Sequence, residues 1–145
     1  MTSVETRSDI RSHQVATSAA EVFAALSDPA RVARWWGPDG FTSTIHEMPF
    51  HVGGTWRLTL HGPDGANYPN EYRVLRIEQN RLLELDHPSE NHHFVLTLTL
   101  TPQGAGTRVD WQQTFDTEAD YQPLAGFLAQ ANEQVLARLS REVLG

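Results

Sequence analysis

The sequence predicts an α+β fold in which a curved antiparallel sheet of about seven strands wraps around one long C-terminal helix. Two observations carry this prediction. Between Phe41 and Phe115, apolar and polar residues alternate with a period of two, and clusters of Gly, Pro, Asn and Asp interrupt the alternation. From Glu118 to Leu144, apolar residues recur at intervals of three and four instead, as in an amphipathic helix. One face of this helix is therefore expected to pack on the sheet.

The first elements precede the alternating region. A short opening strand is predicted from Ile10 to Ala16. The segment Ser18-Ala-Ala-Glu21 then has the spacing of a capping box, in which Ser and Glu serve the free amide groups of a helix start. A first helix is expected to follow, through Leu26.

A second short helix is predicted from the pair Asp28-Pro29. Asp is a favourable N-cap residue, and proline is well tolerated at the first helical position. The helix runs to Trp35 or Trp36, where Gly37-Pro38 ends it. Two of the four tryptophans of the chain thus stand where a helix breaks. Either both rings seal the core, or one of them borders a cavity.

Six strands are predicted in the alternating region, and they form an antiparallel meander with turns at the Gly-, Pro- and Asn-rich breaks. They comprise residues 42–48, 55–61, 71–78, 82–87, 93–101 and 108–115, and one of the breaks covers residues 88–91. In the third of these strands, the apolar positions shift from Tyr72 and Val74 to Leu75 and Ile77. This shift predicts a β-bulge, and it places Asn70 on the inner face beside Tyr72.

Length and composition limit the possible functions. The chain of 145 residues is long enough for one domain, residues 1–145, of which roughly the first eight are expected to be flexible. A formal net charge of −7 and the lack of any Lys or Arg run argue against a nucleic-acid partner or an anionic membrane partner. The chain has no cysteine, which excludes disulfides and thiolate chemistry. Because the N-terminal segment is polar, we expect neither a signal peptide nor a membrane span, and a cytoplasmic location.

Five segments carry a resemblance to a known family: DPARVARWWGPDGFTST, PFHVGGTWRLTLHGPDG, YPNEY, TRVDWQQTF and QANEQVLARL. Together they extend over most of the chain. In their order and spacing they resemble the START-like superfamily, also called SRPBCC, which includes the Bet v pollen allergen fold. Within it, the chain is most similar to the activator of heat-shock protein 90 (Hsp90) ATPase C-terminal-type domains, often labelled polyketide-cyclase-like in bacteria.

The resemblance implies the helix-grip form of the predicted fold, with a cavity between the sheet and the C-terminal helix. It also places Trp35 and Trp36 at the open end of that cavity. Several polar residues share the parity of apolar neighbours and are therefore expected to point inward: His46, His87 and Gln113 on strands, and Asn132 in the apolar stripe of the last helix. The candidate ligand-binding set is Trp35, Trp36, His46, Trp56, Asn70, Tyr72, His87, Trp111, Gln113, Leu128 and Asn132.

A polar patch inside an apolar cavity is typical of a site for a small, mostly apolar ligand. For each polar residue, the alternative is a satisfied hydrogen bond within the core. The seven histidines lack the spacing of a metal motif, so neither a metal nor a cofactor is expected. No nucleophile motif is present either, and no catalytic residue is assigned.

Three functions remain open. The first is the binding of a small apolar or amphipathic ligand without catalysis. The second is a cyclase or related acid–base enzyme, in which His46 or His87 moves a proton on a bound carbonyl compound. The third is a co-chaperone that contacts Hsp90 through its outer surface. We favour the first, while the ligand and the oligomeric state are not predicted.

Overall fold

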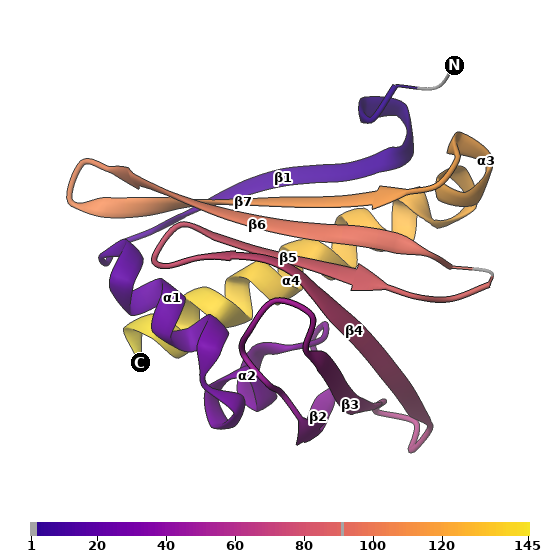
Figure 1. The fold of residues 1–145 in the computed structure, drawn as a ribbon, viewed down its shortest axis with the longest axis horizontal. Coiled ribbons are helices and arrows are strands. Elements are labelled where there is room, and N and C mark those ends of the chain that lie inside the picture. Colours follow the sequence, from indigo (N-terminus) through magenta and orange to yellow (C-terminus); the bar gives the residue numbers. More distant parts are fainter. Residues whose placement is uncertain (1–2, 91) are drawn as a thin grey trace.

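The computed structural model describes residues 3–90 and 92–145. Its centre is one seven-stranded sheet with the strand order β1-β7-β6-β5-β4-β3-β2, in which all neighbours are antiparallel (Figure 1). The elements are a 3₁₀ turn (Glu5–Arg7), β1 (Ser8–Val15), α1 (Ala19–Ser27), α2 (Pro29–Trp35), β2 (Thr42–Glu47), β3 (Thr55–His61), β4 (Asn67–Glu78), β5 (Leu82–His87), β6 (Phe94–Gln103), β7 (Gly106–Phe115), α3 (Glu118–Tyr121), a second 3₁₀ turn (Gln122–Leu124) and α4 (Ala125–Leu144).

The predicted fold class is confirmed, and most strand bounds agree within two residues. The main difference is β4, which begins at Asn67 instead of Glu71. Proline cannot donate to a ladder, so the segment Tyr68-Pro69-Asn70 is an unfavourable place for a strand with two neighbours. Pro69 nevertheless pairs with Thr59 of β3. The pairing of β4 with β5 extends only to Arg73, so Pro69 lies where β4 has a single neighbour.

The predicted bulge in β4 is confirmed, because the register of β4 on β5 shifts between Val74 and Arg76.

Of the predicted turn at residues 88–91, Asn91 lies outside the described residues, as do residues 1 and 2 at the N-terminus. The expected flexibility of the first eight residues stays a prediction. None of the helices in the described ranges is both long and apolar enough to cross a membrane.

The two predicted helix starts are confirmed by their caps. The Ser18 side chain accepts from the Glu21 amide at 3.2 Å, and the Asp28 carboxylate accepts from the Ala30 amide at 3.0 Å. The helical region at the C-terminus extends over residues 118–144 as predicted, but a 3₁₀ turn interrupts it at residues 122–124. Pro123 lies in this turn, and a proline inside an α-helix removes a hydrogen bond.

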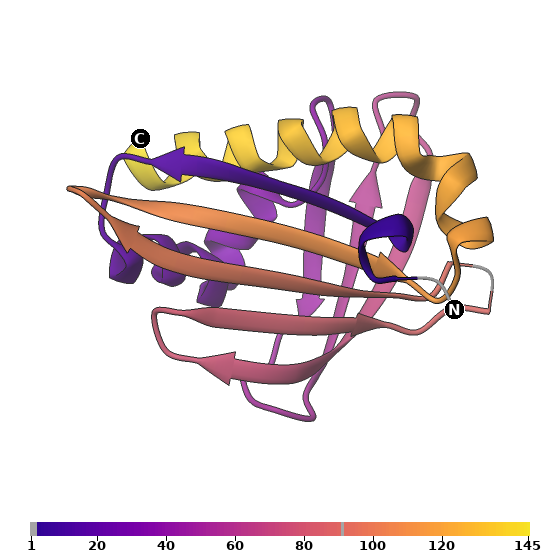
Figure 2. The same cartoon turned by 90° about the horizontal axis from the view of Figure 1, so that it is seen from above.

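The sheet curves around α4, as the two views show (Figures 1 and 2). In Figure 2, α4 extends along the sheet, and α1 and α2 lie near the C-terminal end of α4. The buried side chains between these layers form one apolar cluster, which includes Val22 and Leu26 of α1, Leu83 and Leu85 of β5, Leu96 and Leu98 of β6, and Leu136 and Leu139 of α4. The C-terminal half of α4 is therefore part of the core.

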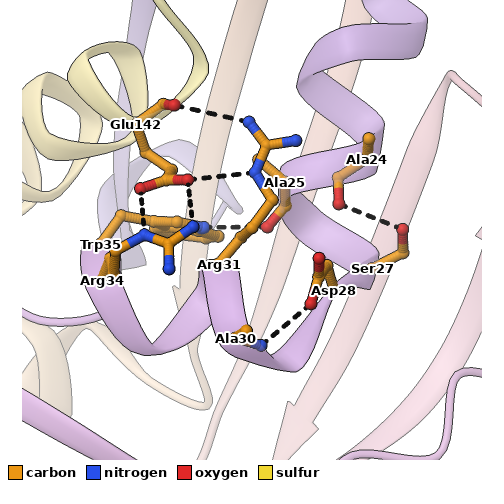
Figure 3. A network of polar contacts seen from close by, with 9 residues as sticks. All are labelled: Ala24, Ala25, Ser27, Asp28, Ala30, Arg31, Arg34, Trp35 and Glu142. Atoms are coloured by element: carbon orange, nitrogen blue, oxygen red, sulfur yellow. Dashed lines mark hydrogen bonds and ion pairs between the residues drawn. The ribbon is translucent and has the colours of Figure 1, made fainter. Parts of the chain in front are cut away.

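Charged groups hold α2 against the end of α4 (Figure 3). Arg31 Nε and Arg34 Nε of α2 donate to the carboxylate of Glu142 at 3.0 and 2.7 Å, and Arg34 Nη2 adds a bond of 2.8 Å. The Glu142 side chain is only 12% exposed. The carboxylate is thus largely removed from water, although Arg34 itself is 58% exposed. The hydrogen bonds from Arg34 and Arg31 lower the pKa of Glu142.

We expect the substitution Glu142→Gln to lower the free energy of unfolding by about 1–3 kcal/mol, because two guanidinium groups lose their charged acceptor. Urea denaturation measures this change. The control is Glu47→Gln, in which Glu47 and its partner Arg57 are both more than half exposed. The control is expected to change stability by less than about 1 kcal/mol. Equal losses in the two variants would contradict a stabilising role of the Glu142 contacts.

Candidate functional site

A cavity of about 470 Å³ lies between the inner face of the sheet and α4. Its apolar lining comes from β3, β6 and α4, and includes Leu60, Phe94, Leu96, Leu128, Ala131 and Val135. Tyr68 and Phe127 also border it, and these rings are 45% and 65% exposed. The side of the cavity that opens to solvent is therefore aromatic.

A buried polar network borders the cavity where α4 crosses β1 and β7. Asp9 and Gln113 are paired residues of β1 and β7, and Asn132 reaches both of them from α4. Asn132 Nδ2 donates to Asp9 Oδ2 at 2.8 Å and to Gln113 Oε1 at 2.9 Å. All three residues are at most 7% exposed. The amide predicted to lie inside the apolar stripe of α4 thus joins the helix to two strands.

The charge of Asp9 is balanced by Arg11. Arg11 Nε and Nη2 donate to the two carboxylate oxygens of Asp9, both at 2.8 Å, and Arg11 Nη1 donates to Glu133 Oε1 at 2.6 Å. Asp9 was missing from the candidate set, because the opening strand was predicted to begin only at Ile10. A signal for it existed: Asp9 shares the parity of Val15, which lies in the core.

The second wall of the cavity forms where α2 ends. Gly37 has a φ of +107°, a left-handed conformation that favours glycine, and it turns the chain after Trp36. Arg138 of α4 holds this turn, since its guanidinium donates to the carbonyl oxygens of Arg34, Gly37 and Pro38 at 2.7 to 3.0 Å. Gly37 and Pro38 therefore line the cavity together with the Trp36 ring.

The two adjacent tryptophans have different surroundings. Trp35 is fully buried, and its Nε1 donates to Ala25 O at 3.0 Å. Trp36 lines the cavity, with its ring centroid 5.3 Å from that of Tyr72. Trp56 resembles Trp35: it is fully buried, and its Nε1 donates to Pro49 O at 2.9 Å. Trp35 and Trp56 of the candidate set thus belong to the core and do not line the cavity.

Tyr72 and Asn70 bring two further polar groups to the cavity. The Tyr72 hydroxyl donates to Asn70 Oδ1 across 3.5 Å, which is a long bond. Burial raises the pKa of the Tyr72 phenol well above its usual value, so the group is neutral at physiological pH.

His46 does not point inward, and this expectation is wrong. The pairing of β2 with β3 shifts between Ile45 and Glu47, and this irregularity displaces His46 from the alternation that Met48 and Phe50 suggested. The side chain is exposed, and its Nε2 lies 2.8 Å from Thr59 Oγ1.

His87 borders a groove that includes His46 and does not itself line the cavity. Its side chain nevertheless lies on the face of the cavity residues, with the ring centroid 5.2 Å from that of Tyr72. Its ring stacks on the cavity residue Phe94 with a centroid distance of 4.4 Å, and its Nδ1 lies 3.0 Å from His92 O. Burial lowers the pKa of His87. In the described ranges, no three His, Cys, Asp or Glu side chains are grouped so that they could hold a metal ion.

The structure thus brings seven of the candidate residues together at one cavity: Trp36, Asn70, Tyr72, Trp111, Gln113, Leu128 and Asn132. Within the described part of the chain, Trp111 Nε1 is the one buried side-chain polar atom without a hydrogen-bond partner. An unsatisfied buried donor is unfavourable, and this one lies in a residue of the cavity wall.

Comparisons with known proteins agree with this architecture. The family model described as "Activator of Hsp90 ATPase homolog 1-like protein" matches residues 16–143. A solution structure from Arthrobacter aurescens has a TM-score of 0.90 and 24% identity, with 99% of this chain and 90% of that chain covered. A crystal structure from Nitrosomonas europaea has a TM-score of 0.87 and 15% identity, covering 99% and 98% of the two chains.

A third solved structure carries a family name. It is an AHSA1-like protein from Aeromonas hydrophila with a TM-score of 0.74 and 20% identity, covering 94% of this chain and 92% of that chain. At these identities the likeness of the structures concerns the fold alone. No curated protein matches the sequence.

We expect Asn132→Leu to lower the free energy of unfolding by about 1–3 kcal/mol, because Asp9 and Gln113 then lose a donor inside the protein. Denaturant unfolding measures the loss. The control is Gln130→Leu, which places the same residue at an exposed position of α4. An Asn132→Leu variant as stable as this control would show that the network does not stabilise the fold.

A second prediction concerns His93, whose Nε2 and Nδ1 each lie 2.6 Å from a carboxylate, of Asp86 and Asp116 respectively. The hydrogen bond that His93 donates to Asp86, together with the one to Asp116, raises the pKa of His93 above its ordinary value of 6.5. Stability from these ion pairs is therefore fully present below pH 6.5 and is lost as the pH rises through the raised pKa.

The stability difference between the wild type and His93→Gln should thus be larger at about pH 5.5 than at about pH 8.5. The lowered pKa of His87 acts in the opposite direction, but His87 is present in both proteins, so its contribution largely cancels in the difference. Urea melts at the two pH values provide the test, and a difference independent of pH would contradict it.

Proposed function

Because the chain belongs to the family of activator of Hsp90 ATPase homolog 1-like proteins, we propose that it acts through the cavity of this fold, as a binding protein for a small apolar or amphipathic molecule. The observation that carries the proposal is the composition of the cavity wall. It is mostly apolar, with a few polar groups gathered from β4, β7 and α4. Pockets for small molecules commonly combine these properties at volumes of roughly 300–1,000 Å³.

Binding is favoured over acid–base catalysis by the positions of the histidines. Neither His46 nor His87, the candidates for proton transfer, is among the residues that line the cavity. Of the polar groups at the cavity, the Tyr72 phenol has a raised pKa, which makes it a weak acid near neutral pH. A cyclase reaction in this cavity would therefore need a different proton carrier.

A contact with Hsp90 is the alternative that the family description suggests. It would use the outer surface of the molecule and is compatible with a ligand in the cavity. Stimulation of the ATPase of purified Hsp90 by this protein would support it. A ligand that changes this stimulation would connect the two functions.

The binding proposal is tested with N-phenyl-1-naphthylamine, an uncharged dye that fluoresces in apolar surroundings. We expect saturable binding of one dye per chain. Ala131→Phe places a bulky ring in the cavity wall and is expected to weaken binding about tenfold or more, which corresponds to about 1.4 kcal/mol.

The matched control is Ala129→Phe, also on α4 but not at the cavity. This variant is expected to bind the dye as the wild type does. Absence of dye binding to the wild type, or equal binding by both variants, would refute the proposal.

A further inference from the structure

The contacts among Asp9, Gln113 and Asn132 determine which atom of each side chain donates and which accepts. They therefore also determine which donor and acceptor atoms remain for a ligand. The Asp9 carboxylate can only accept hydrogen bonds, so the Asn132 atom at 2.8 Å from it has to be the amide nitrogen. That nitrogen also lies 2.9 Å from the Gln113 amide, which must then present its oxygen. The two hydrogens of Asn132 Nδ2 are thereby used.

The other ends of the two amides remain free. Gln113 Nε2 and Asn132 Oδ1 have no hydrogen-bond partner within the described residues, and both side chains line the cavity. Trp111 stands two residues before Gln113 on the same face of β7, and its buried Nε1 also lacks an acceptor. Because Trp111 Nε1 is inaccessible, the free donor that β7 offers to the cavity is Gln113 Nε2.

The charges around this wall disfavour an anion. The described residues that line the cavity include no Asp, Glu, Lys, Arg or His. Behind Asn132, the single guanidinium of Arg11 is shared by two carboxylates, those of Asp9 and Glu133. On the other side of the cavity, the guanidinium of Arg138 is directed at the carbonyl oxygens of Arg34, Gly37 and Pro38 and does not line the cavity. An anionic group in the cavity would therefore contact no cation, and burying it without one is costly.

Building on the proposed function, we infer that the ligand is uncharged and carries a carbonyl or hydroxyl oxygen, which accepts a hydrogen bond from Gln113 Nε2. A hydroxyl group can in addition donate to Asn132 Oδ1. The apolar part of the ligand lies against Leu96, Leu128 and Val135. The Arg11–Asp9 pair does not touch the ligand, but it orients the amides that do.

The test compares three naphthalenes substituted at the same ring position: the methyl ketone, the isopropyl hydrocarbon and the carboxylate. Each competes with N-phenyl-1-naphthylamine for the protein. We expect the carboxylate to bind about a hundredfold more weakly than the ketone, because its charge is not compensated. Gln113→Met is expected to weaken ketone binding about threefold to tenfold, the range of one net hydrogen bond, and to leave the hydrocarbon unchanged or bound more tightly.

Gln112→Met is the matched control. Gln112 is the neighbour of Gln113 on β7, but its side chain belongs to the other face, where its Nε2 donates to Thr114 Oγ1 at 3.2 Å. This variant should keep all three affinities. If Gln113→Met weakens ketone and hydrocarbon equally, or if the carboxylate binds as well as the ketone, the inference is wrong.

A measurement on the wild type covers the case in which Gln113→Met does not fold. The infrared carbonyl stretch of the bound ketone is expected at a lower frequency than in a hydrocarbon solvent, as for a hydrogen-bonded carbonyl. A stretch at the frequency found in hydrocarbon solvent would overturn the inference while leaving ligand binding intact. If neither the dye nor any competitor binds, the proposed function itself fails.

Discussion

The buried carboxylate of Asp9 is the constraint on which the arrangement of the sheet and the last helix depends. A carboxylate that is only 3% exposed needs donors inside the protein, and it obtains them from Arg11 on its own strand and from Asn132 on α4. Gln113 of β7 completes the group through its bond to Asn132. One polar contact thus joins the first strand, the last strand and the C-terminal helix. The same contact places the helix that forms one wall of the cavity.

The other end of α4 is held by different chemistry. There, Arg138 binds the carbonyl groups at the end of α2, and Glu142 binds two arginines of the same short helix. The cavity residues of α4, from Leu128 to Val135, lie on the N-terminal side of these contacts. The C-terminal turns secure the helix, and the preceding turns are available to contact a ligand. The C-terminal turns therefore serve stability alone, whereas the turn that carries Asn132 contributes both to the fold and to the cavity wall.

Local patterns in the sequence were sufficient for most of the fold. Ser18 and Asp28 marked helix starts because capping involves neighbours in the chain, and the shift of parity after Val74 marked the bulge. The predictions that failed concern side-chain positions that depend on residues far away in the sequence. The irregular pairing of β2 with β3 moved His46 outward, and no local signal separates the core ring of Trp35 from the cavity ring of Trp36. Gln113 and Asn132 were each expected to point inward, but Asp9 was missed because the opening strand was predicted to begin at Ile10, one residue after it. The bond from Asn132 to Asp9 joins residues 123 positions apart, which no local pattern indicates.

The pairing of β1 with β7 has a consequence for the kinetics of folding. Strands β2 to β7 follow each other as neighbours in both sequence and space, so each hairpin closes a short loop. The first strand has no such neighbour, since Ser8 pairs with Thr114, 106 residues away. Closing so long a loop costs chain entropy before any contact compensates it, and topologies with such contacts fold slowly. During synthesis, β1 leaves the ribosome first but has no partner in the sheet until β7 is made.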